Sequence, residues 1–348
     1  MERLRAISFG QGRPIELLDQ TELPSAEVYR QVGTVAELRE AIQSLRVRGA
    51  PLLGVTAAAG MALAAETLGT TDAALRAACD EIAGARPTAV ELQSMAHRAL
   101  RAALAVAPDG RVAALWAFAQ ALAEAREAED DALARHGAAL FGPGTTILTH
   151  CNTGTLATGA LGTALGVVAQ VHADGNLARC FADETRPLLQ GARLTMWELQ
   201  RRGIPATLLP DGAAASLLAT GQVTAVITGA DRIAMNGDAA NKVGTAGLAI
   251  LAQHFGVPLY IAAPLTTFDP ATPSGVAIPI EQRAASEVTG YRGLEWAPAG
   301  SHVYNPAFDV TGAGLITAFI TERGLLRPPF GRSVAGTLGS ASPILGVD

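Results

Sequence analysis

A cysteine and an aspartate that follow two predicted strands are the residues best placed to do chemistry in this sequence. Cys151 follows the apolar run 145–149, and Asp231 follows the apolar run 225–228. In an open parallel sheet, ligands bind beyond the carboxyl ends of the strands. A thiol and a carboxylate there can approach one substrate from two sides, and an isomerase needs such an acid and base. The simpler alternatives are a buried structural thiol and an aspartate that caps a turn or pairs with Arg232.

The surroundings of the three cysteines set Cys151 apart from the other two. A glycine-containing turn and a helix start follow Cys151, so backbone amides there would lower the pKa of its thiol. Cys79 and Cys180 lie within apolar helix and strand patterns, which are typical of buried, unreactive thiols. Unpaired cysteine spacing and an N-terminus without a signal-like segment favour a reducing compartment. We therefore expect a cytoplasmic protein.

Three predicted helix starts carry side chains that could hold an anion. Free backbone N–H groups at a helix start, together with a guanidinium or an ammonium, favour a bound phosphate. At each helix start, an exposed side chain without a ligand is the more frequent explanation for the Arg or Lys. Three such starts in a chain with few charged residues nevertheless favour an anion site. The residues are Arg48, Gly49 and Ala50 before Pro51, then Arg86 before Pro87, then Asn241 and Lys242 before Gly244.

The sequence lacks the motifs of several other kinds of site. It has no G-x-G-x-x-G after a strand, no G-x-x-x-x-G-K-[ST] and no G-x-S-x-G, which counts against nucleotide cofactors and serine hydrolysis. Its six histidines do not have the spacing of a zinc site. We therefore expect no cofactor and no metal.

Short apolar runs alternate with helix-length segments from residue 144 onward. This alternation predicts a parallel sheet that is covered by helices on both faces, a doubly wound Rossmann-like domain. The candidate strands are 145–149, 167–171, 177–182, 206–209, 225–228 and 259–262, and the candidate helices between them are 188–202, 213–219 and 244–255.

The residues before this sheet have helical spacing instead. Thr34 followed by Glu37 predicts a capping box at the first of these helices. We therefore predict an α/β fold with a mostly helical N-terminal domain over 1–135, a Rossmann-like domain over 136–327 and a mobile tail, rich in Pro, Gly and Ser, over 328–348. The predicted N-terminal helices cover 35–45, 52–68, 73–83, 89–104 and 111–135.

The composition excludes several classes of protein. Of the 348 residues, 49% are hydrophobic and only 17% are charged, which argues against a disordered chain. The net charge is -6 and the basic residues are scattered, so no nucleic-acid partner is expected. The uncharged stretch 142–173 is long enough to span a bilayer, but its polar residues and many glycines indicate a buried strand, loop, helix and strand. We expect no membrane association.

Seven motifs together closely resemble the methylthioribose-1-phosphate isomerases, a family related to the regulatory subunits of the eukaryotic initiation factor two-B complex. The resemblance covers residues 3–327. The motifs are RGAPLLGV (48–55), ARPTAVEL (85–92), THCNTGTLATGALGTALGV (149–167), ETRPLLQGARLT (184–195), GIPATLLPDGAA (203–214), TGADRIAMNGDAANKVGT (228–245) and VYNPAFDVT (303–311).

The resemblance implies roles for individual residues. The family's catalytic cysteine falls on Cys151 and its catalytic aspartate on Asp231. Two positions depart from the family pattern: Ala246, where a tyrosine is frequent, and Gly212, where an asparagine is frequent. They leave the catalytic pair intact and bear on the shape of the substrate pocket. The family's substrate-holding groups fall on Arg48 and Ala50 with Gly49 between them, Arg86, Gln190, Asn241 and Lys242.

The resemblance also implies a reaction, the isomerisation of 5-methylthioribose 1-phosphate to the corresponding ketose 1-phosphate in methionine salvage, by a homodimer. Because C1 carries a phosphate ester, the sugar ring cannot open as an ordinary hemiacetal does, and the ring oxygen needs acid assistance. We hypothesise that neutral Cys151 donates this proton while Asp231 takes a proton at C2. A helix start favours the thiolate, whereas a proton donor must stay protonated. A closed, apolar site would raise the pKa of both groups, and we expect this desolvation to outweigh the helix start at Cys151.

Two alternatives remain open from the sequence. The substrate could be 5-deoxyribose 1-phosphate or ribose 1,5-bisphosphate, which share the reacting carbons with 5-methylthioribose 1-phosphate. The chain could instead be a non-catalytic regulatory subunit that senses a sugar phosphate. Retention of both Cys151 and Asp231 argues against the second alternative, because a binding module needs no pair of acid and base.

Overall fold

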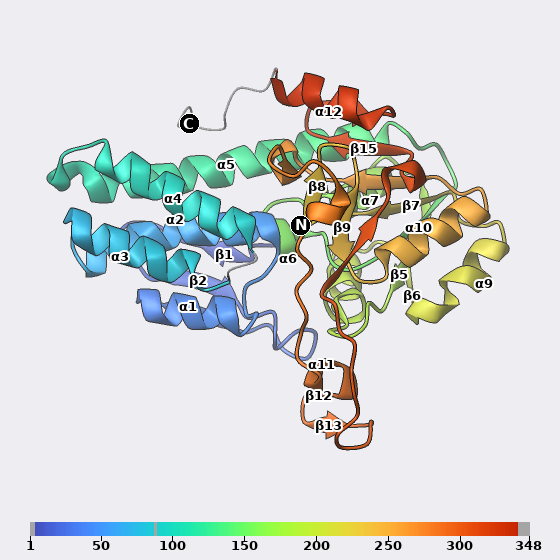
Figure 1. Cartoon of the computed structure of the whole chain (residues 1–348), viewed down its shortest axis with the longest axis horizontal. Helices are drawn as coiled ribbons and strands as arrows, with labels where there is room; N and C mark the ends of the chain where they lie inside the picture. Colours follow the sequence, from blue (N-terminus) through green and yellow to red (C-terminus); the bar gives the residue numbers. More distant parts are fainter. Residues whose placement is uncertain (1–3, 87–88, 340–348) are drawn as a thin grey trace. The chain divides into compact units, whose positions relative to one another are not determined.

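The computed structural model describes residues 4–86 and 89–339. The chain forms two compact units, the first from residues 4–129 and 154–162 and the second from residues 130–153 and 163–339. Helices dominate the first unit and a mostly parallel sheet dominates the second, so the predicted α/β class is confirmed (Figure 1). The predicted domain boundaries at residues 135 and 327 stay predictions.

The helices of the first unit begin where the sequence predicts them. Thr34 caps the first helix with its hydroxyl, which accepts from the Glu37 amide at 3.2 Å, and the Glu37 carboxylate accepts from the Thr34 amide at 3.0 Å. This is the predicted capping box, which satisfies two of the amides that a helix start leaves open. The helices are α1 (Val35–Gln43), α2 (Ala50–Thr67), α3 (Asp72–Ala83), α4 (Val90–Leu104), α5 (Arg111–Ala138) and α6 (Thr155–Thr158).

The central helix of the first unit is α2, which packs against α1, α3, α4 and α6. It is apolar on every face, as a helix enclosed by others has to be. Length and composition alone would allow α2 to cross a membrane, but 78% of that stretch is buried inside the protein. A helix that is covered by its own chain has no face left for lipid.

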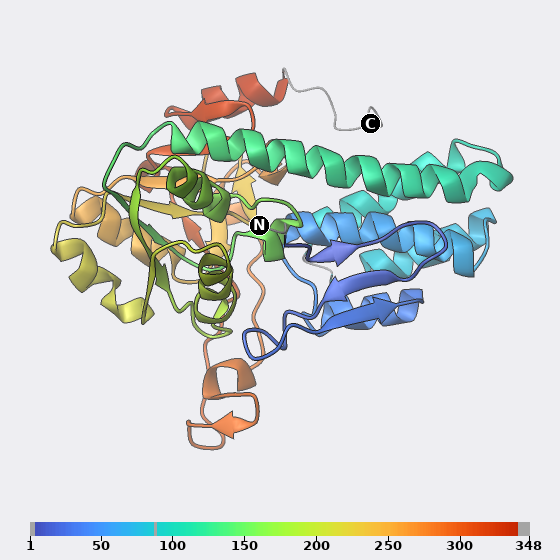
Figure 2. The same ribbon diagram turned by 180° about the vertical axis from the view of Figure 1, so that it is seen from behind.

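The first unit also contains a three-stranded antiparallel sheet that the sequence analysis did not predict (Figure 2). Its strands are two to four residues long, and only β2 has a mostly buried pattern. Such short strands leave no alternation to detect in the sequence. They are β1 (Ile7–Ser8), β2 (Ile15–Leu18) and β3 (Tyr29–Val32).

A seven-stranded sheet organises the second unit, in the order β16-β15-β10-β7-β4-β5-β6. Its strands pair in parallel except for β16, which pairs antiparallel with β15. Counted from β4, the order is that of a doubly wound sheet, 3-2-1-4-5-6, with one strand added. The strands are β4 (Thr145–Thr149), β5 (Leu177–Asp183), β6 (Ala206–Leu209), β7 (Ala225–Thr228), β10 (Leu259–Ala262), β15 (Ala318–Thr321) and β16 (Gly324–Leu326).

Two hydrophobic clusters cover the two faces of this sheet. Neighbouring residues of one strand alternate between them: Ile147 belongs to one cluster and Leu148 to the other. This alternation follows from the two-residue period of a strand. One face packs on the end of α5, on α7 (Ala164–Ala173) and on α8 (Met196–Arg201). The other packs on α9 (Ala214–Ala219), α10 (Thr245–His254) and α12 (Phe330–Gly339), and Figure 1 shows α9 beside α10.

Two segments of the second unit differ from the prediction. Residues 167–171, expected to be a strand, lie inside α7. A short, wholly apolar run suits a buried helix as well as a strand, and periodicity cannot separate the two. The expected mobile tail contains α12, whose Phe330 and Val334 are buried in the core because they lie on one face of a helix of small residues. Residues 340–348 of that tail lie outside the described residues.

Smaller elements fill the long connections of the second unit. A four-stranded sheet has the order β11-β8-β9-β14, and a short hairpin, β12-β13, follows α11. Figure 1 shows this hairpin projecting from the second unit. The strands and helix are β8 (Arg232–Ala234), β9 (Ala239–Lys242), β11 (Phe268–Asp269), α11 (Ser286–Thr289), β12 (Gly290–Tyr291), β13 (Leu294–Glu295) and β14 (Phe308–Thr311).

Candidate active site

The point where the strand order reverses lies between β4 and β7, which are neighbours in the sheet. In a doubly wound sheet, ligands bind in the crevice at the carboxyl ends of these two strands. Cys151 follows β4 and Asp231 follows β7. The two following loops also approach each other, because a Cβ atom on Gly229 would lie 2.8 Å from a methyl carbon of Thr153. The predicted acid and base therefore lie at the same edge of the same sheet.

Cys151 is held in an unusual backbone conformation. Its φ is 65°, in the left-handed region that residues with a side chain rarely adopt. Two threonines fix the peptide groups around it: the Cys151 amide donates to Thr185 Oγ1 at 2.8 Å, and the Thr195 hydroxyl donates to the Cys151 carbonyl at 2.6 Å. The thiol is free of disulfides and 8% exposed. Strain that the surroundings enforce in this way is typical of functional sites.

The loop after β5 has the same kind of strain. Thr185 also has a φ of 65°, a rare conformation for a β-branched residue. The Asp211 carboxylate holds this loop by accepting from the amides of Thr185 and Arg186, both at 2.7 Å. The sequence places Thr185 and Asp211 after predicted strands at this edge, but their hydrogen bonds, and Thr195 altogether, were missed, because nothing in the spacing reveals a bond to a distant loop.

The predicted helix start behind Cys151 is smaller than expected. It is α6, which has only four residues. A helix dipole grows with the number of aligned peptide groups, so α6 gives little support to a lowered thiol pKa. The helix start expected after Cys151 is therefore present but short, and its effect on the thiol stays a prediction.

Asp231 is exposed in this chain. The sequence analysis expected this carboxylate in a closed, apolar environment, which the described structure does not provide. Its backbone amide donates to the Ala240 carbonyl at 2.9 Å, which ties the residue to β9. Its neighbour Arg232 forms an ion pair with Asp269, with Nη1 3.6 Å from Oδ2.

Gln190 lies in the turn between β5 and a five-residue π-helix, Gly191–Thr195. Its side chain is 5% exposed, and its amide oxygen finds no hydrogen-bond partner among the residues that the structure describes. A buried amide oxygen without a partner costs about 1–3 kcal/mol. Such a group in a native protein points to a bound molecule that completes the hydrogen bond.

Asn241 and Lys242 end strand β9, just before α10. The Asn241 amide donates to Thr245 Oγ1 at 2.9 Å, and Lys242 Nζ donates to the Ala307 carbonyl at 2.9 Å. Two of the backbone amides at the start of α10, which could have bound an external anion, already bind a carboxylate of the chain itself. The Asp309 carboxylate accepts from the amides of Gly244 and Ala246 at 2.7 and 3.1 Å, and its own burial raises its pKa.

Arg48, Gly49 and Ala50 open α2 in the first unit, as predicted. Gly49 has a φ of 92°, and a Cβ atom there would lie 2.3 Å from the Ala157 carbonyl oxygen, so only glycine fits. Arg48 Nε donates to the Gln20 amide oxygen at 3.2 Å, and the Gln20 amide donates to the Leu156 carbonyl at 2.7 Å. The neutral amide of Gln20 thus binds one nitrogen of the Arg48 guanidinium.

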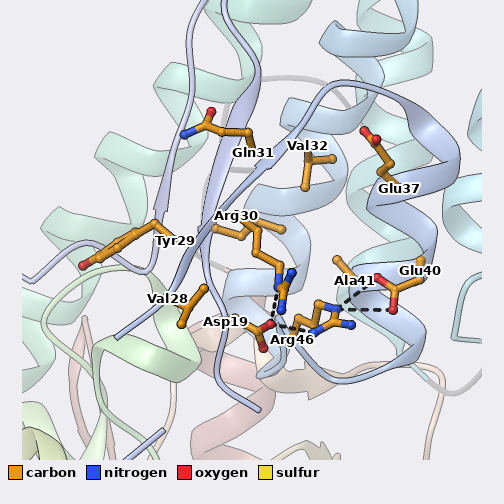
Figure 3. Close-up of a pocket in the computed structure, with 11 residues that line it drawn as sticks. Asp19, Val28, Tyr29, Arg30, Gln31, Val32, Glu37, Glu40, Ala41 and Arg46 are labelled. Carbon is orange, nitrogen blue, oxygen red and sulfur yellow. Dashed lines mark hydrogen bonds and ion pairs between the residues drawn. The ribbon is translucent and has the colours of Figure 1, made fainter. Parts of the chain in front are cut away.

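A buried carboxylate lies beside Gln20 in the first unit (Figure 3). Asp19 is fully buried and accepts from Arg30 Nε and, at 2.6 Å, from Arg46 Nη1. Burial alone would raise the pKa of Asp19, but the hydrogen bonds from Thr21, Arg30 and Arg46 together lower it. Asp19, Arg30 and Arg46 line a cavity of about 390 Å³ between β2, β3 and α1. Its two arginines are already paired with carboxylates, so this cavity has no free cation to offer an anion.

Arg86 lies in the turn before α4, and its carbonyl accepts from the Ala89 amide at 3.0 Å. Pro87, predicted to lie in the first turn of a helix, and Thr88 are outside the described residues. The structure thus brings Cys151, Asp231, Gln190, Asn241 and Lys242 to one edge of the second unit. Arg48, Gly49, Ala50 and Arg86 belong to the first unit.

One group of described side chains has the distances of a metal site. Ligand atoms of His150, Asp183 and Asp211 lie within 4.8 Å of one another. However, both ring nitrogens of His150 and both oxygens of Asp211 already have protein partners. Because both ring nitrogens of His150 are engaged, the ring has no lone pair left for a cation, and the group does not fit a metal in this arrangement.

The other two cysteines are structural, as predicted. Cys79 and Cys180 are fully buried. Burial raises the pKa of Cys79 to about 11 and that of Cys180 to about 12. Both thiols are therefore protonated and shielded at neutral pH.

Comparison with known proteins agrees with this arrangement. The sequence profile of the initiation factor 2 subunit family matches residues 46–328. The methylthioribose-1-phosphate isomerase of Yersinia pestis (strain Pestoides F) is 51% identical over 316 residues, which is 90% of each chain. The 5-deoxyribose 1-phosphate isomerase of Moorella thermoacetica is 47% identical and covers 98% of this chain and 99% of its own.

A solved structure is similar over nearly the whole length. The 5-methylthioribose 1-phosphate isomerase from Pyrococcus horikoshii OT3 has a TM-score of 0.92 at 38% identity, covering 98% of this chain and 97% of its own. The resemblance seen in the motifs is therefore confirmed. The chain belongs to the initiation factor 2 subunit family, alongside the methylthioribose-1-phosphate isomerases of that family.

Proposed function

We propose that this protein is a methylthioribose-1-phosphate isomerase, which converts 5-methylthioribose 1-phosphate into 5-methylthioribulose 1-phosphate. Relatives of that name match nearly all of the chain at about half identity. The observation that carries the proposal is the position of Cys151 and Asp231, which follow the two neighbouring strands at the reversal of the sheet order. Gln190 supports it, because its buried amide oxygen still needs a hydrogen-bond donor such as a sugar hydroxyl.

The reaction needs two proton transfers. The bond between C1 and the ring oxygen breaks, the ring oxygen gains a proton, the C2 hydroxyl loses one, and the hydrogen on C2 ends on C1. In our proposal the Cys151 thiol supplies the proton to the ring oxygen, and the Asp231 carboxylate accepts the proton at C2. A positioned acid and base of this kind contribute typically about 10²–10⁴-fold to a rate.

The remaining predicted residues would hold the substrate. We assign Arg48, Arg86 and Lys242 to the phosphate as the cationic groups, with the Gly49 and Ala50 backbone beside Arg48. Asn241 and Gln190 are amides and suit sugar hydroxyls. We further propose a cytoplasmic homodimer that acts in methionine salvage without a cofactor.

The nature of the group on C5 of the sugar is the main open choice within this activity. The relative from Moorella thermoacetica is named for 5-deoxyribose 1-phosphate, which carries hydrogen where 5-methylthioribose 1-phosphate carries a methylthio group. A bisphosphate would need further cations near C5. We favour the methylthio sugar because relatives named for it have the higher identity, 51% against 47%.

The decisive experiment is an assay of ketose formation from the three sugar phosphates, with wild-type protein and Cys151→Ser. We expect the highest kcat/KM with 5-methylthioribose 1-phosphate, and a loss of at least about a hundredfold in Cys151→Ser. Cys79→Ala is the matched control, since it removes a buried thiol that has no proposed role. Silence of the wild type on all three substrates, together with binding of one of them, would favour a non-catalytic sensing subunit instead.

A further inference from the structure

His150, the residue before Cys151, is a buried histidine whose two ring nitrogens are both engaged. Nδ1 lies 2.9 Å from Asp183 Oδ2 and Nε2 lies 2.9 Å from the Val243 carbonyl oxygen. The side chain is 1% exposed. Nothing in the proposed acid and base chemistry uses this ring, so its complete engagement needs an explanation.

The partners of His150 fix where its protons lie. A carbonyl oxygen only accepts, so Nε2 carries a hydrogen, and Nδ1 shares a second proton with the Asp183 carboxylate. Burial opposes the charged ring and lowers the pKa of His150, but the hydrogen bond and charge of Asp183 outweigh this and raise it. Burial raises the pKa of Asp183 in turn. The carboxylates of Asp211, Glu184 and Asp309 also act on this pair.

Each ring nitrogen binds a different segment of the site. Asp183 ends β5, and its backbone carbonyl accepts from the Thr185 hydroxyl at 3.1 Å. That same hydroxyl accepts from the Cys151 amide. The end of β5 therefore holds His150 by its side chain and Cys151 by way of Thr185, so the strained peptide of Cys151 lies between two attachments to one strand.

The second nitrogen reaches the segment that carries Asn241 and Lys242. Val243 directly follows Lys242, and Gly244 packs against the ring so closely that a Cβ atom there would lie 2.8 Å from Cε1 and 2.9 Å from Nε2. Gly244 has a φ of 108°, so this approach also depends on a conformation that suits glycine. The imidazole of His150, which follows β4, thus connects this segment to the end of that strand.

We propose that His150 is a positioning residue that holds the thiol of Cys151 and the segment Asn241–Lys242 in a fixed mutual arrangement. Its bond to Asp183 fixes the position of the Cys151 thiol. Its bond to Val243 fixes the position of the segment Asn241–Lys242, which is proposed to hold the substrate. This inference rests on the proposed function and deepens it. A positioned group has to be held within a fraction of an ångström of its working geometry, so loss of either bond should have its own kinetic signature.

Two substitutions separate the two bonds. The amide nitrogen of asparagine lies where His Nδ1 lies, and that of glutamine lies where Nε2 lies. His150→Gln should keep the bond to Val243 and lose the one to Asp183, so we expect kcat to fall about tenfold with KM within about twofold. His150→Asn should keep the bond to Asp183 and lose the one to Val243, so we expect KM to rise about tenfold with kcat within about twofold.

Further variants keep the test valid if a His150 variant folds poorly. Asp183→Asn preserves shape and removes the charge that strengthens the bond to Nδ1, so it should lower kcat as His150→Gln does, by a smaller factor. His136→Ala is the control: His136 binds the Thr321 carbonyl at 3.0 Å through one nitrogen, so its loss should lower the unfolding temperature and leave both kinetic constants unchanged.

The outcomes distinguish this inference from the proposed function. A fall of kcat alone in His150→Gln and a rise of KM alone in His150→Asn, with Asp183→Asn following His150→Gln, would support positioning by both nitrogens. Parallel changes in all three variants, or none beyond twofold in an active wild type, would overturn the inference and leave the isomerase intact. An inactive wild type would overturn both.

Discussion

A charged cluster in the first unit and the sheet edge of the second unit hold buried polar groups in different ways. In the first unit, Arg126 is 2% exposed and donates to both oxygens of Glu91 at 3.0 and 3.1 Å and to Glu129 at 2.8 Å. At the sheet edge of the second unit, Asp183 Oδ1 and Gln190 Oε1 are buried without a partner among the described residues. Cys151 and Thr185 are strained at the same edge. The first arrangement stabilises a fold, and the second costs stability, which a ligand can recover.

The largest effect should come from breaking the paired cluster of the first unit. Arg126→Met removes the cation that binds both Glu91 and Glu129, and it leaves the buried Glu91 carboxylate without this partner. We expect the free energy of unfolding to fall by about 3–5 kcal/mol, measured by urea denaturation. Arg101→Met, an exposed arginine on α4, is the control and should change it by less than about 0.5 kcal/mol. Equal stability of both variants would contradict the structural role of Arg126.

At the edge of the second unit, substitution should affect activity instead of stability. Asp231→Asn removes the proposed base and keeps its shape, and the residue is exposed. We expect kcat/KM to fall at least about a hundredfold while the unfolding temperature stays unchanged. Asp174→Asn, an exposed aspartate on the same unit, should alter neither quantity. Activity within tenfold of wild type would remove Asp231 from the mechanism.

Substitution of Gln190 tests the effects on stability and on substrate binding at a single residue. Gln190→Met keeps the length of the side chain and removes the buried amide oxygen that lacks a partner. We expect the free energy of unfolding to stay the same or rise, because an unsatisfied polar atom is lost, while KM rises about tenfold. Steady-state kinetics and urea denaturation of the same preparation check both. A loss of stability without a change of KM would mean that the amide serves the fold.

The carboxyl edge of the sheet could be predicted because a strand and its end are marked by residues that are neighbours in the sequence. The runs before Cys151 and Asp231 are apolar and bounded by polar residues, so four of the six predicted strands, among them β4 and β7, match the structure residue for residue. A fifth, 177–182, ends one residue short of β5. The run 167–171 failed because a wholly apolar segment carries no period, and it lies in α7.

The details of the site depend on contacts between distant residues, and these could not be predicted. Asp309, 65 positions away in the sequence, accepts from the Gly244 amide at the start of α10, so this amide is not available to an external anion. The exposure of Asp231 and the strain at Thr185 also arise from tertiary packing. Only the identity of the residues could be predicted from the motifs, and the way they are held had to come from the structure.

The smallest expected effect concerns the pH dependence of stability in the first unit, where Asp19 is paired. Its pKa is lowered in the folded state, so it contributes stability above its unfolded pKa of about 3.9, and this contribution is lost as the pH falls through the lower folded value. Arg30 is 45% and Arg46 25% exposed, so solvent screens the pairs and we expect no more than about 1 kcal/mol.

Comparison with Asp19→Asn isolates this contribution from other acidic groups. The difference in the free energy of unfolding between wild type and Asp19→Asn should be constant above about pH 5 and shrink below about pH 4. Urea denaturation at several pH values measures it. A difference that stays constant down to about pH 2 would mean that the Asp19 carboxylate is no more acidic in the folded protein than in the unfolded chain. The contrast between the units would then rest on the Arg126 cluster alone.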